Sequence, residues 1–268
     1  MPRRLGLILE YDGRDFAGWQ WQPKKRTVHG VVREALSTLL REPDPVVHCS
    51  VRTDAGVHAL YQVAHVDTAS DIDILRLRGG LDALLPRDVA PVGVADMPGD
   101  FHARRSAQSK TYCYRILNRD ARSPVDRDRI WHVRKPLDVP AMAGAARYLV
   151  GTHDFACFEG RLSVASSTVR TIHSLEVTRQ GDAVHLRVTG NGFLKYMVRN
   201  IAGTLAEIGL GKRAPDSMAG ILASHDRSAA GLTAPPGGLC LERVAYPEPF
   251  ESALRAGLVF RGRSPAGL

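Results

Sequence analysis

The hydrophobic pattern of this chain switches between strand and helix periods, and the order of these switches constrains the fold more than any other feature. Apolar side chains alternate with other residues over Leu5–Tyr11, which predicts a half-buried strand. Residues 28–40 instead carry apolar side chains at helical spacing, with Thr27 as the predicted N-cap. The other elements expected in this half are strands at about 46–52 and 62–68 and a short helix that begins at or borders Gly79-Gly80 and reaches Leu85.

The second half of the chain follows the same order of strand, helix, strand and strand without repeating the sequence. Its expected elements are a strand at 111–117, a helix at 139–150, a hairpin at 170–178 and 183–190 with its turn at Gln180-Gly181-Asp182, a long helix from Phe193 to Ile208 that stops at Gly209, a helix at 216–224 and a strand at 239–245. The order predicts an α+β protein made of two related subdomains with antiparallel sheets.

The boundaries of these parts follow from the same pattern. We place the first subdomain at residues 1–108 and the second at residues 109–248. Residues 119–135 are rich in Arg, Asp and Pro and are expected to form an exposed loop. Residues 249–268 are expected to be a loosely ordered tail.

The composition is that of an ordinary globular protein, with 268 residues, of which 44% are hydrophobic and 24% charged. A net charge of +8 is compatible with a polyanionic partner. The four cysteines form no CxxC pair and the ten histidines lack metal-ligand spacing, which predicts reduced thiols and no metal site. The longest early apolar run, Leu5–Leu9, is too short for a signal peptide or a membrane span. These features predict a cytoplasmic protein.

The string Arg52–Ala59, Arg-Thr-Asp-Ala-Gly-Val-His-Ala, places a single carboxylate between an arginine and a turn of small residues. Arg52 is near enough in sequence to hold a substrate phosphate or to lower the pKa of Asp54. Ala55-Gly56 gives the backbone freedom and leaves room for a ligand. On chemistry alone, however, an Asp before Ala-Gly is more often a turn residue that bonds its own backbone.

Further strings accompany this one in order along residues 5–246. They are Tyr11-Asp12-Gly13, Phe16-Ala17-Gly18-Trp19-Gln20 with Gln22, Thr27-Val28, Phe101-His102-Ala103-Arg104, Lys110-Thr111-Tyr112-Cys113-Tyr114, Gly151-Thr152-His153-Asp154-Phe155, Met197-Val198-Arg199-Asn200, and Gly238-Leu239 with Val244. Each is weak alone. Together they resemble the TruA-type tRNA pseudouridine synthases, in which the Asp of the Arg52–Ala59 string is the nucleophile.

The resemblance implies a fold of two ferredoxin-like, RNP-like halves whose antiparallel sheets join across a central catalytic cleft. It implies isomerisation of uridine to pseudouridine at positions 38 to 40 of the tRNA anticodon stem-loop, with the base flipped out of its stack. It also implies a homodimer and a reaction that needs neither a metal nor a small-molecule cofactor. Asp54 would attack either C1′ of the ribose or C6 of the base, and the sequence does not choose between them.

Two residues of the second half match family positions in the active site. Tyr112 would stack on the uracil and carry a proton from C5, although Tyr112, Tyr114 and Ile116 share one strand face and are also explained as core. Arg199 would pair with the nucleophilic Asp54. The alternative explanation of Arg199 is a solvated residue on the helix expected from Phe193. It would lie one turn after Lys195 and on the same face of that helix.

Basic residues of the first half are the candidates for RNA contact. Arg52 would lie at the entrance and fill the space left by the flipped base, and Lys24, Lys25 and Arg26 form a basic loop after two tryptophans. The alternative for this loop is a solvated turn with one buried Trp. Arg104 and His58 match family positions that line the site, with no role assigned to His58. The chain departs from the family pattern at His29 and Arg105, neither of which belongs to the chemical strings.

Two other classes of protein compete with this interpretation. A catalytically silent RNA-binding module could share the fold, but the set of Asp54, Tyr112 and Arg199 argues against it. An Asp-dependent nucleoside hydrolase or glycosidase shares attack at C1′, but that class uses a second carboxylate at matched distance, and no paired-acid motif lies near Asp54. Release of free base or ribose separates a hydrolase from an isomerase.

Overall fold

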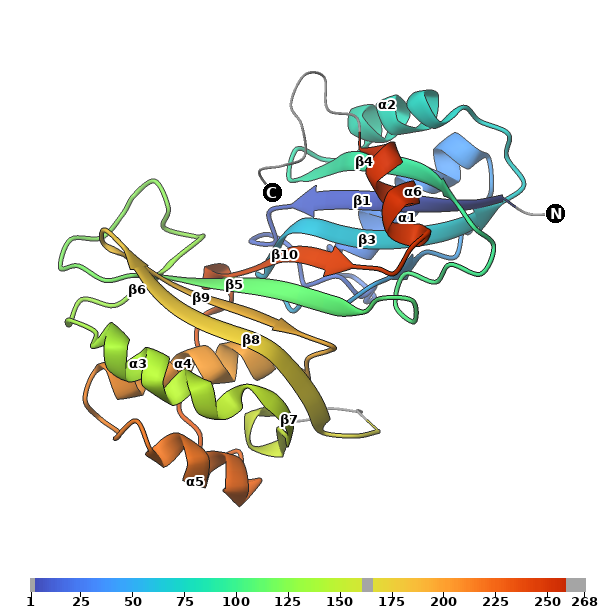
Figure 1. Ribbon diagram of the computed structural model, residues 1–268. Coiled ribbons are helices and arrows are strands. Elements are labelled where there is room, and N and C mark those ends of the chain that lie inside the picture. The colour runs from blue at the N-terminus through green and yellow to red at the C-terminus, as the bar shows by residue number, and fades with distance from the viewer. Residues whose placement is uncertain (1–2, 161–165, 259–268) are drawn as a thin grey trace. The chain divides into compact units, whose positions relative to one another are not determined.

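The computed structural model describes residues 3–160 and 166–258. The chain combines α-helices with β-strands that pair mostly antiparallel, as the pattern predicts (Figure 1). Its described residues form two compact units, unit 1 with residues 3–108 and 243–258 and unit 2 with residues 109–160 and 166–242. Strand β10, Leu239–Ala245, contributes residues to each unit.

The sheet of unit 1 is built around β1, Arg3–Tyr11, which pairs antiparallel with β3, His58–Thr68, on one side and with β4, Val89–Met97, on the other. The expected strand at 46–52 is reduced to β2, His48–Cys49, which pairs antiparallel with β3. Strand β4 was not anticipated from the sequence, because Pro91 and Gly93 interrupt its pattern.

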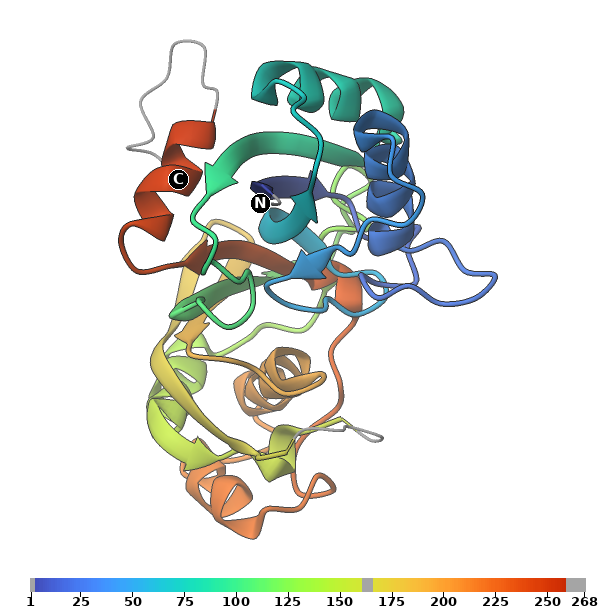
Figure 2. The same cartoon turned by 90° about the vertical axis from the view of Figure 1, so that its right-hand side faces the viewer.

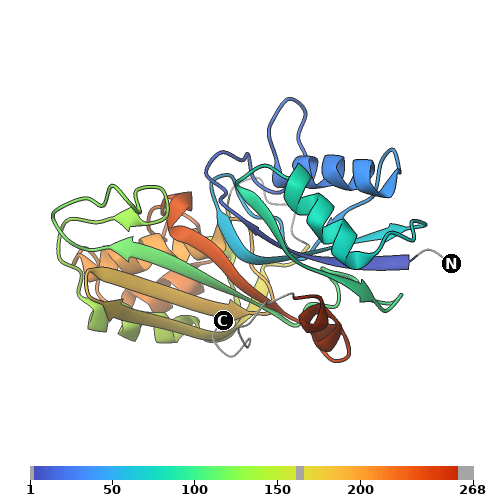
Figure 3. The ribbon, with the colours of Figure 1, turned by 90° about the horizontal axis from the view of Figure 1, so that it is seen from above.

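The central strand β1 is buried on both faces, whereas its alternating pattern predicts burial on one. Helices α1, Val28–Leu40, and α2, Ile74–Leu84, lie on one face of the sheet, and α6, Phe250–Gly257, lies on the other (Figure 3). A Cβ on Gly6 would meet Leu254 of α6 at 3.2 Å. The expectation of a loosely ordered tail from residue 249 is therefore wrong for α6, and residues 259–268 lie outside the described part.

The two long helices of unit 1 begin at side-chain caps. The hydroxyl of Thr27 accepts from the N–H of Gly30, which confirms the predicted N-cap of α1. Helix α2 begins earlier than expected, because Asp73 caps it by accepting from two backbone N–H groups. Gly80 therefore lies inside α2, where a Cβ would come within 2.5 Å of the Leu39 side chain of α1. The glycine allows the two helices to approach each other.

In unit 2, four strands pair antiparallel in the order β5-β9-β8-β7. Its strands are β5 (Ser109–Leu117), β7 (Gly151–Asp154), β8 (Val169–Gln180) and β9 (Ala183–Gly190), with the short β6 (Trp131–His132) parallel to β5. The hairpin of β8 and β9 turns at Gly181, which has φ of +56°, as its sequence predicts.

The helices of unit 2 are α3 (Val139–Ala146), α4 (Met197–Gly209) and α5 (Ser217–Ser224), with short 3₁₀ turns at Arg147–Leu149, Ala156–Phe158 and Pro236–Gly238. Helices α3 and α4 lie on one face of the sheet, with α5 next to α3 (Figures 1 and 2). Helix α4 starts four residues later than expected, because Tyr196 takes a left-handed φ of +61°. Lys195 therefore precedes the helix and does not share a helical face with Arg199, so that expectation is wrong.

None of the helices in the described ranges is both long enough and apolar enough to cross a membrane.

Candidate active site

Asp54 lies in unit 1, in the loop that joins β2 to β3. Thr53 is buried and Asp54 is partly exposed, so the carboxylate lies beside the core yet within reach of a ligand. The loop turns back at once, since the N–H of Val57 donates to the carbonyl of Asp54 at 3.2 Å. Gly56 has φ of +78°, a conformation that favours glycine, which explains the small residue at this place in the string.

The segment after β1 holds this loop from one side through backbone contacts. The N–H of Trp19 donates to the carbonyl of Thr53 at 3.0 Å, and the N–H of Gly56 donates to the carbonyl of Phe16 at 3.3 Å. Gly18, with φ of +95°, passes so close that a Cβ would lie 2.7 Å from the oxygen of Thr53. The string Phe16–Gln20 therefore shapes the Asp54 loop, although it contributes none of the predicted catalytic side chains.

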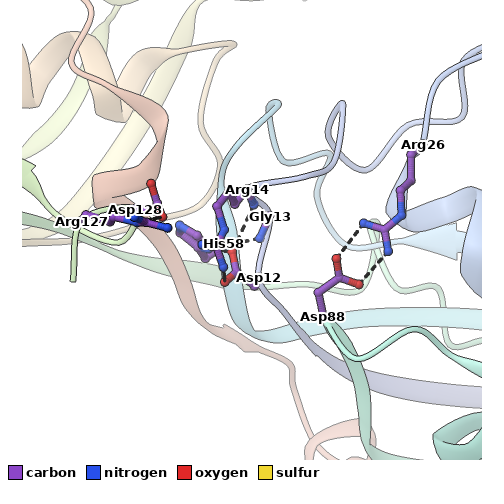
Figure 4. A network of polar contacts seen from close by, with 8 residues as sticks. All are labelled: Asp12, Gly13, Arg14, Arg26, His58, Asp88, Arg127 and Asp128. Atoms are coloured by element: carbon purple, nitrogen blue, oxygen red, sulfur yellow. Dashed lines mark hydrogen bonds and ion pairs between the residues drawn. The ribbon is translucent and has the colours of Figure 1, made fainter. Parts of the chain in front are cut away.

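His58 closes the other end of the loop, at the first residue of β3 (Figure 4). Its Nδ1 accepts from the N–H of Gly13 at 3.1 Å and lies 3.1 Å from Oδ1 of Asp12. Asp12 also accepts from Arg14 at 3.0 Å. The residues with no role assigned from sequence, Asp12 and His58, thus join the strand β1 terminus to the end of the Asp54 loop.

Two arginines flank this loop. Arg52 and Arg104 are both exposed, and both act electrostatically on the Cys49 thiol. Neither takes part in an ion pair with the residues described in the structure. Their positive charge is therefore open to an anionic ligand.

The three cations of the basic loop 24–26 have different surroundings, which the sequence does not indicate. Both terminal nitrogens of Arg26 donate to the carboxylate of Asp88, at 2.6 and 2.8 Å (Figure 4). The Arg26 guanidinium also lies 4.0 Å from the Phe16 ring centroid. Lys24 and Lys25 are exposed. Of the three cations, Arg26 is thus the one whose hydrogen-bonding groups are used within unit 1.

Tyr112 lies in unit 2 on β5 and is 5% exposed. Its ring meets the edge of Phe193, with centroids 5.3 Å apart and planes at 89°. Its neighbour Tyr114 is fully buried and donates to the carbonyl of Pro235, as expected for a core residue. The burial of Tyr112 agrees with both explanations of this residue, so its catalytic role stays a prediction.

Arg199 lies in the first turn of α4 and is half-buried. Its Nε donates to the carbonyl of Ala234 at 2.8 Å, and its guanidinium lies 4.9 Å from the ring centroid of Tyr196. The alternative of an ordinary solvated helix residue is therefore wrong. The guanidinium of Arg199 is fixed by the Ala234 carbonyl and the Tyr196 ring. Its pairing with Asp54 stays a prediction.

The fold divides the predicted site residues between the two units. Unit 1 carries Asp54, Arg52, Lys24, Lys25, Arg26 and Arg104, and unit 2 carries Tyr112 and Arg199. Sequence reasoning missed the residues that hold the Asp54 loop. The string Tyr11-Asp12-Gly13 was the available signal, because it matched the family without an assigned role.

Comparison with known proteins identifies the class. The family model described as tRNA pseudouridine synthase matches residues 145–247. Proteins named tRNA pseudouridine synthase A are similar along most of the chain. That of Geotalea uraniireducens is 47% identical over 91% of this chain and its own full length, and that of Methylococcus capsulatus is 45% identical over 92% of this chain and 91% of its own. A solved Cbf5-Nop10-Gar1 complex is a distant structural neighbour, with 12% sequence identity and a TM-score of 0.36. The match covers 91% of this chain and 58% of the other.

The class is thus that of the pseudouridine synthases, enzymes that isomerise uridine to pseudouridine. Within that class, the chain belongs to the tRNA pseudouridine synthase A family.

Proposed function

We propose that this enzyme modifies uridines at positions 38 to 40 in the anticodon stem-loop of tRNA, with Asp54 as nucleophile. The observation that carries the proposal is the state of Asp54, a partly exposed carboxylate on a loop whose backbone is held from both sides. Nucleophilic catalysis needs a group that is both reachable and fixed. We place the reaction in the cytoplasm, where its substrate would be met.

The chemistry assigned to the side chains follows the needs of the reaction. Asp54 attacks C1′ or C6 of a flipped uridine, the N1–C1′ bond breaks, and the turned base rejoins the ribose through C5. The bond to Asp54 then breaks, either as C5 displaces the carboxylate from C1′ or as the carboxylate leaves C6, so the free carboxylate is restored. The proton on C5 must then leave, and we assign its transfer to the hydroxyl of Tyr112. Arg199 pairs with Asp54 and keeps its carboxylate ionised and oriented. This requires the two units to form ferredoxin-like halves that meet at one catalytic cleft.

We assign contact with the RNA to basic residues that form no ion pair with a carboxylate among the described residues of unit 1. We propose that Lys24, Lys25 and Arg104 contact the phosphate backbone and that Arg52 enters the space vacated by the flipped base. The bidentate pair with Asp88 supports a different role for Arg26, as the anchor of this loop. We further propose a homodimer as the functional form.

The test is carbodiimide-based mapping of pseudouridine in unmodified tRNA after incubation with the purified protein. We expect reverse-transcription stops that report pseudouridine at one or more of positions 38 to 40. No free uracil should appear in the supernatant, because isomerisation releases no product other than the modified tRNA. Free uracil or ribose would support the nucleoside hydrolase, and binding without either product would support the silent RNA-binding module.

A further inference from the structure

We infer that a buried chain of four hydrogen-bonding side chains, Ser50, Gln62, Tyr11 and Thr53, positions the Asp54 loop for catalysis. This inference rests on the proposed function and extends it to residues that do not react themselves. The relay, as we call these four residues, starts at Ser50, immediately after β2, passes through Gln62 of β3 and Tyr11 of β1, and ends at the residue immediately before Asp54.

The relay is continuous and closed to water. Ser50 Oγ donates to Gln62 Oε1 at 2.6 Å, and Gln62 Nε2 donates to the Tyr11 hydroxyl at 3.3 Å. That hydroxyl lies 2.8 Å from Oγ1 of Thr53. The exposed fractions of the four residues are 1%, 0%, 3% and 6%. Polar groups buried to this extent are costly when unpaired, so each member of the chain depends on the others.

A backbone group sets the orientation of the Gln62 amide. The carbonyl of Val51 only accepts, and it lies 2.8 Å from Gln62 Nε2, which fixes the orientation of the Gln62 amide. The second proton of Nε2 therefore goes to the Tyr11 oxygen. The Tyr11 hydroxyl and Thr53 Oγ1 complete the chain through a hydrogen bond in which either oxygen can donate.

The geometry ties Thr53 down at two points. Its side chain is held by Tyr11 and its carbonyl by the N–H of Trp19. Gln62 also donates to the carbonyl of Val51, so the relay binds the segment before Asp54 at both Val51 and Thr53. Because backbone torsions at Thr53 set where the Asp54 carboxylate points, loosening the relay moves the reacting oxygen without removing any reacting group. A misplacement of 1 Å can cost about a hundredfold in rate.

Apolar side chains could fill the same space without leaving any buried polar group that needs a hydrogen-bond partner. The retention of four polar side chains beneath a partly exposed carboxylate points to orientation as their use. Tyr11, Thr53 and Gln62 are therefore positioning residues, and none needs to touch the RNA.

The experiment compares two threonines of unit 1 that each lose a buried hydroxyl. Thr53→Val removes the end of the relay. Thr68→Val, at the far end of β3, removes an equally buried hydroxyl that donates to Glu42 at 2.6 Å. We expect Thr53→Val to lower the single-turnover rate at saturating enzyme by about tenfold to a hundredfold with little change in tRNA affinity. Thr68→Val should lose a comparable amount of thermal stability and keep the wild-type rate.

Two further variants test whether the hydroxyl groups act as one chain. Thr53→Ser keeps the hydroxyl and should restore most of the rate. Tyr11→Phe should resemble Thr53→Val, and the double variant should be no slower than the slower single one, since both break the same bond. Equal rate losses in Thr53→Val and Thr68→Val, or a wild-type rate in Thr53→Val, would overturn the inference.

Hydrogen exchange separates this inference from the proposed function. The amides of residues 53–57 should exchange faster in Thr53→Val and unchanged in Thr68→Val, whether or not the protein modifies tRNA. Absence of pseudouridine in the wild type counts against the proposed function alone. Unchanged exchange at 53–57 in Thr53→Val counts against the relay alone.

Discussion

The two regions that carry the predicted chemistry are held by different means. In unit 1, Asp54 lies on a loop without regular structure, fixed by buried hydroxyl, amide and imidazole groups. In unit 2, Tyr112 belongs to a paired strand and Arg199 to the first turn of a helix. The backbone of the second region is set by ladders of main-chain hydrogen bonds and apolar packing.

The difference matters for how each region fails. A loop held partly by buried side chains can shift when one of their hydroxyl groups is removed, so remote substitutions should be able to misplace Asp54. A strand or helix keeps its backbone when an active-site side chain is trimmed, so substitutions there report on that side chain alone. The predictions below use this contrast.

After loss of the nucleophile itself, Tyr112→Phe should have the largest effect. Its strand keeps its backbone, so the variant should fold and bind tRNA while single-turnover pseudouridine formation falls by roughly a hundredfold to ten-thousandfold, as for a lost acid–base group. A rate near that of the wild type in Tyr112→Phe, with failure only in Tyr112→Ala, would reduce Tyr112 to a packed ring. In that case the second region would contribute shape and no proton transfer.

Arg199→Ala should come next, with a fall of about a hundredfold in the single-turnover rate, similar to the loss of one electrostatic stabiliser. In the proposed pair the cation favours the ionised carboxylate, so its loss should move the acid limb of the pH–rate profile to higher pH. Arg199→Lys restores the charge without the planar fork and should repair the rate only in part. An acid limb at the wild-type position in Arg199→Ala would show that the two regions do not meet through this pair.

A smaller effect is expected at the basic loop of unit 1. Lys25→Ala should reduce the slope of log affinity against log salt by about 0.7 to 0.9, the value for one phosphate contact, without changing thermal stability. Arg26→Ala should instead lower thermal stability, because it breaks the pair with Asp88. Titrations of tRNA at several salt concentrations, with melting curves, measure both. If Arg26→Ala changes the salt slope and leaves the melting temperature alone, the assignment within the loop is reversed.

The smallest effect concerns a histidine cluster near the start of the Asp54 loop. His65 is buried between His48 and His102, with ring centroids 4.8 Å away from each, and its Nδ1 accepts from the N–H of Ala103. Burial, reinforced by the charge of His48, lowers the pKa of His65 to about 3 from its usual 6.5.

The depressed pKa of His65 means that the folded protein binds fewer protons than the unfolded chain at acidic pH. Its contribution to stability is complete above about pH 6.5 and is lost as the pH falls toward 3, at no more than about 1.4 kcal/mol per pH unit. Denaturant unfolding between pH 7 and 4 should therefore show a shallower pH slope in His65→Leu than in the wild type. Parallel slopes would assign the acid sensitivity to other groups.

Much of the fold could be predicted because its signals are local. The cap of α1 and the glycine turn of the β8–β9 hairpin depend on residues adjacent in sequence. Helix α6 and the two-sided burial of β1 are long-range features, since α6 covers a face of a strand some 240 residues away. Strand β4 was hidden by Pro91 and Gly93, and the delayed start of α4 by the strained backbone of Tyr196.

The candidate site was predicted unevenly for the same reason. Asp54, Tyr112 and Arg199 carry reactive groups within recognisable strings. Tyr11 and Gln62 reach Thr53 and Val51 from 42 and 11 residues away, and no local pattern marks such contacts. Arg26 looked like one more basic residue because Asp88, its partner, is 62 residues distant.

The central claim, that Asp54 is the nucleophile, is tested most directly by the single-turnover rate of Asp54→Asn at saturating enzyme. The amide keeps the shape of the side chain but cannot attack carbon, while tRNA affinity rests mainly on phosphate contacts. We predict no pseudouridine at positions 38 to 40 and nearly unchanged tRNA affinity. Pseudouridine formation by Asp54→Asn, after mass spectrometry has excluded deamidation to Asp, would contradict the claim.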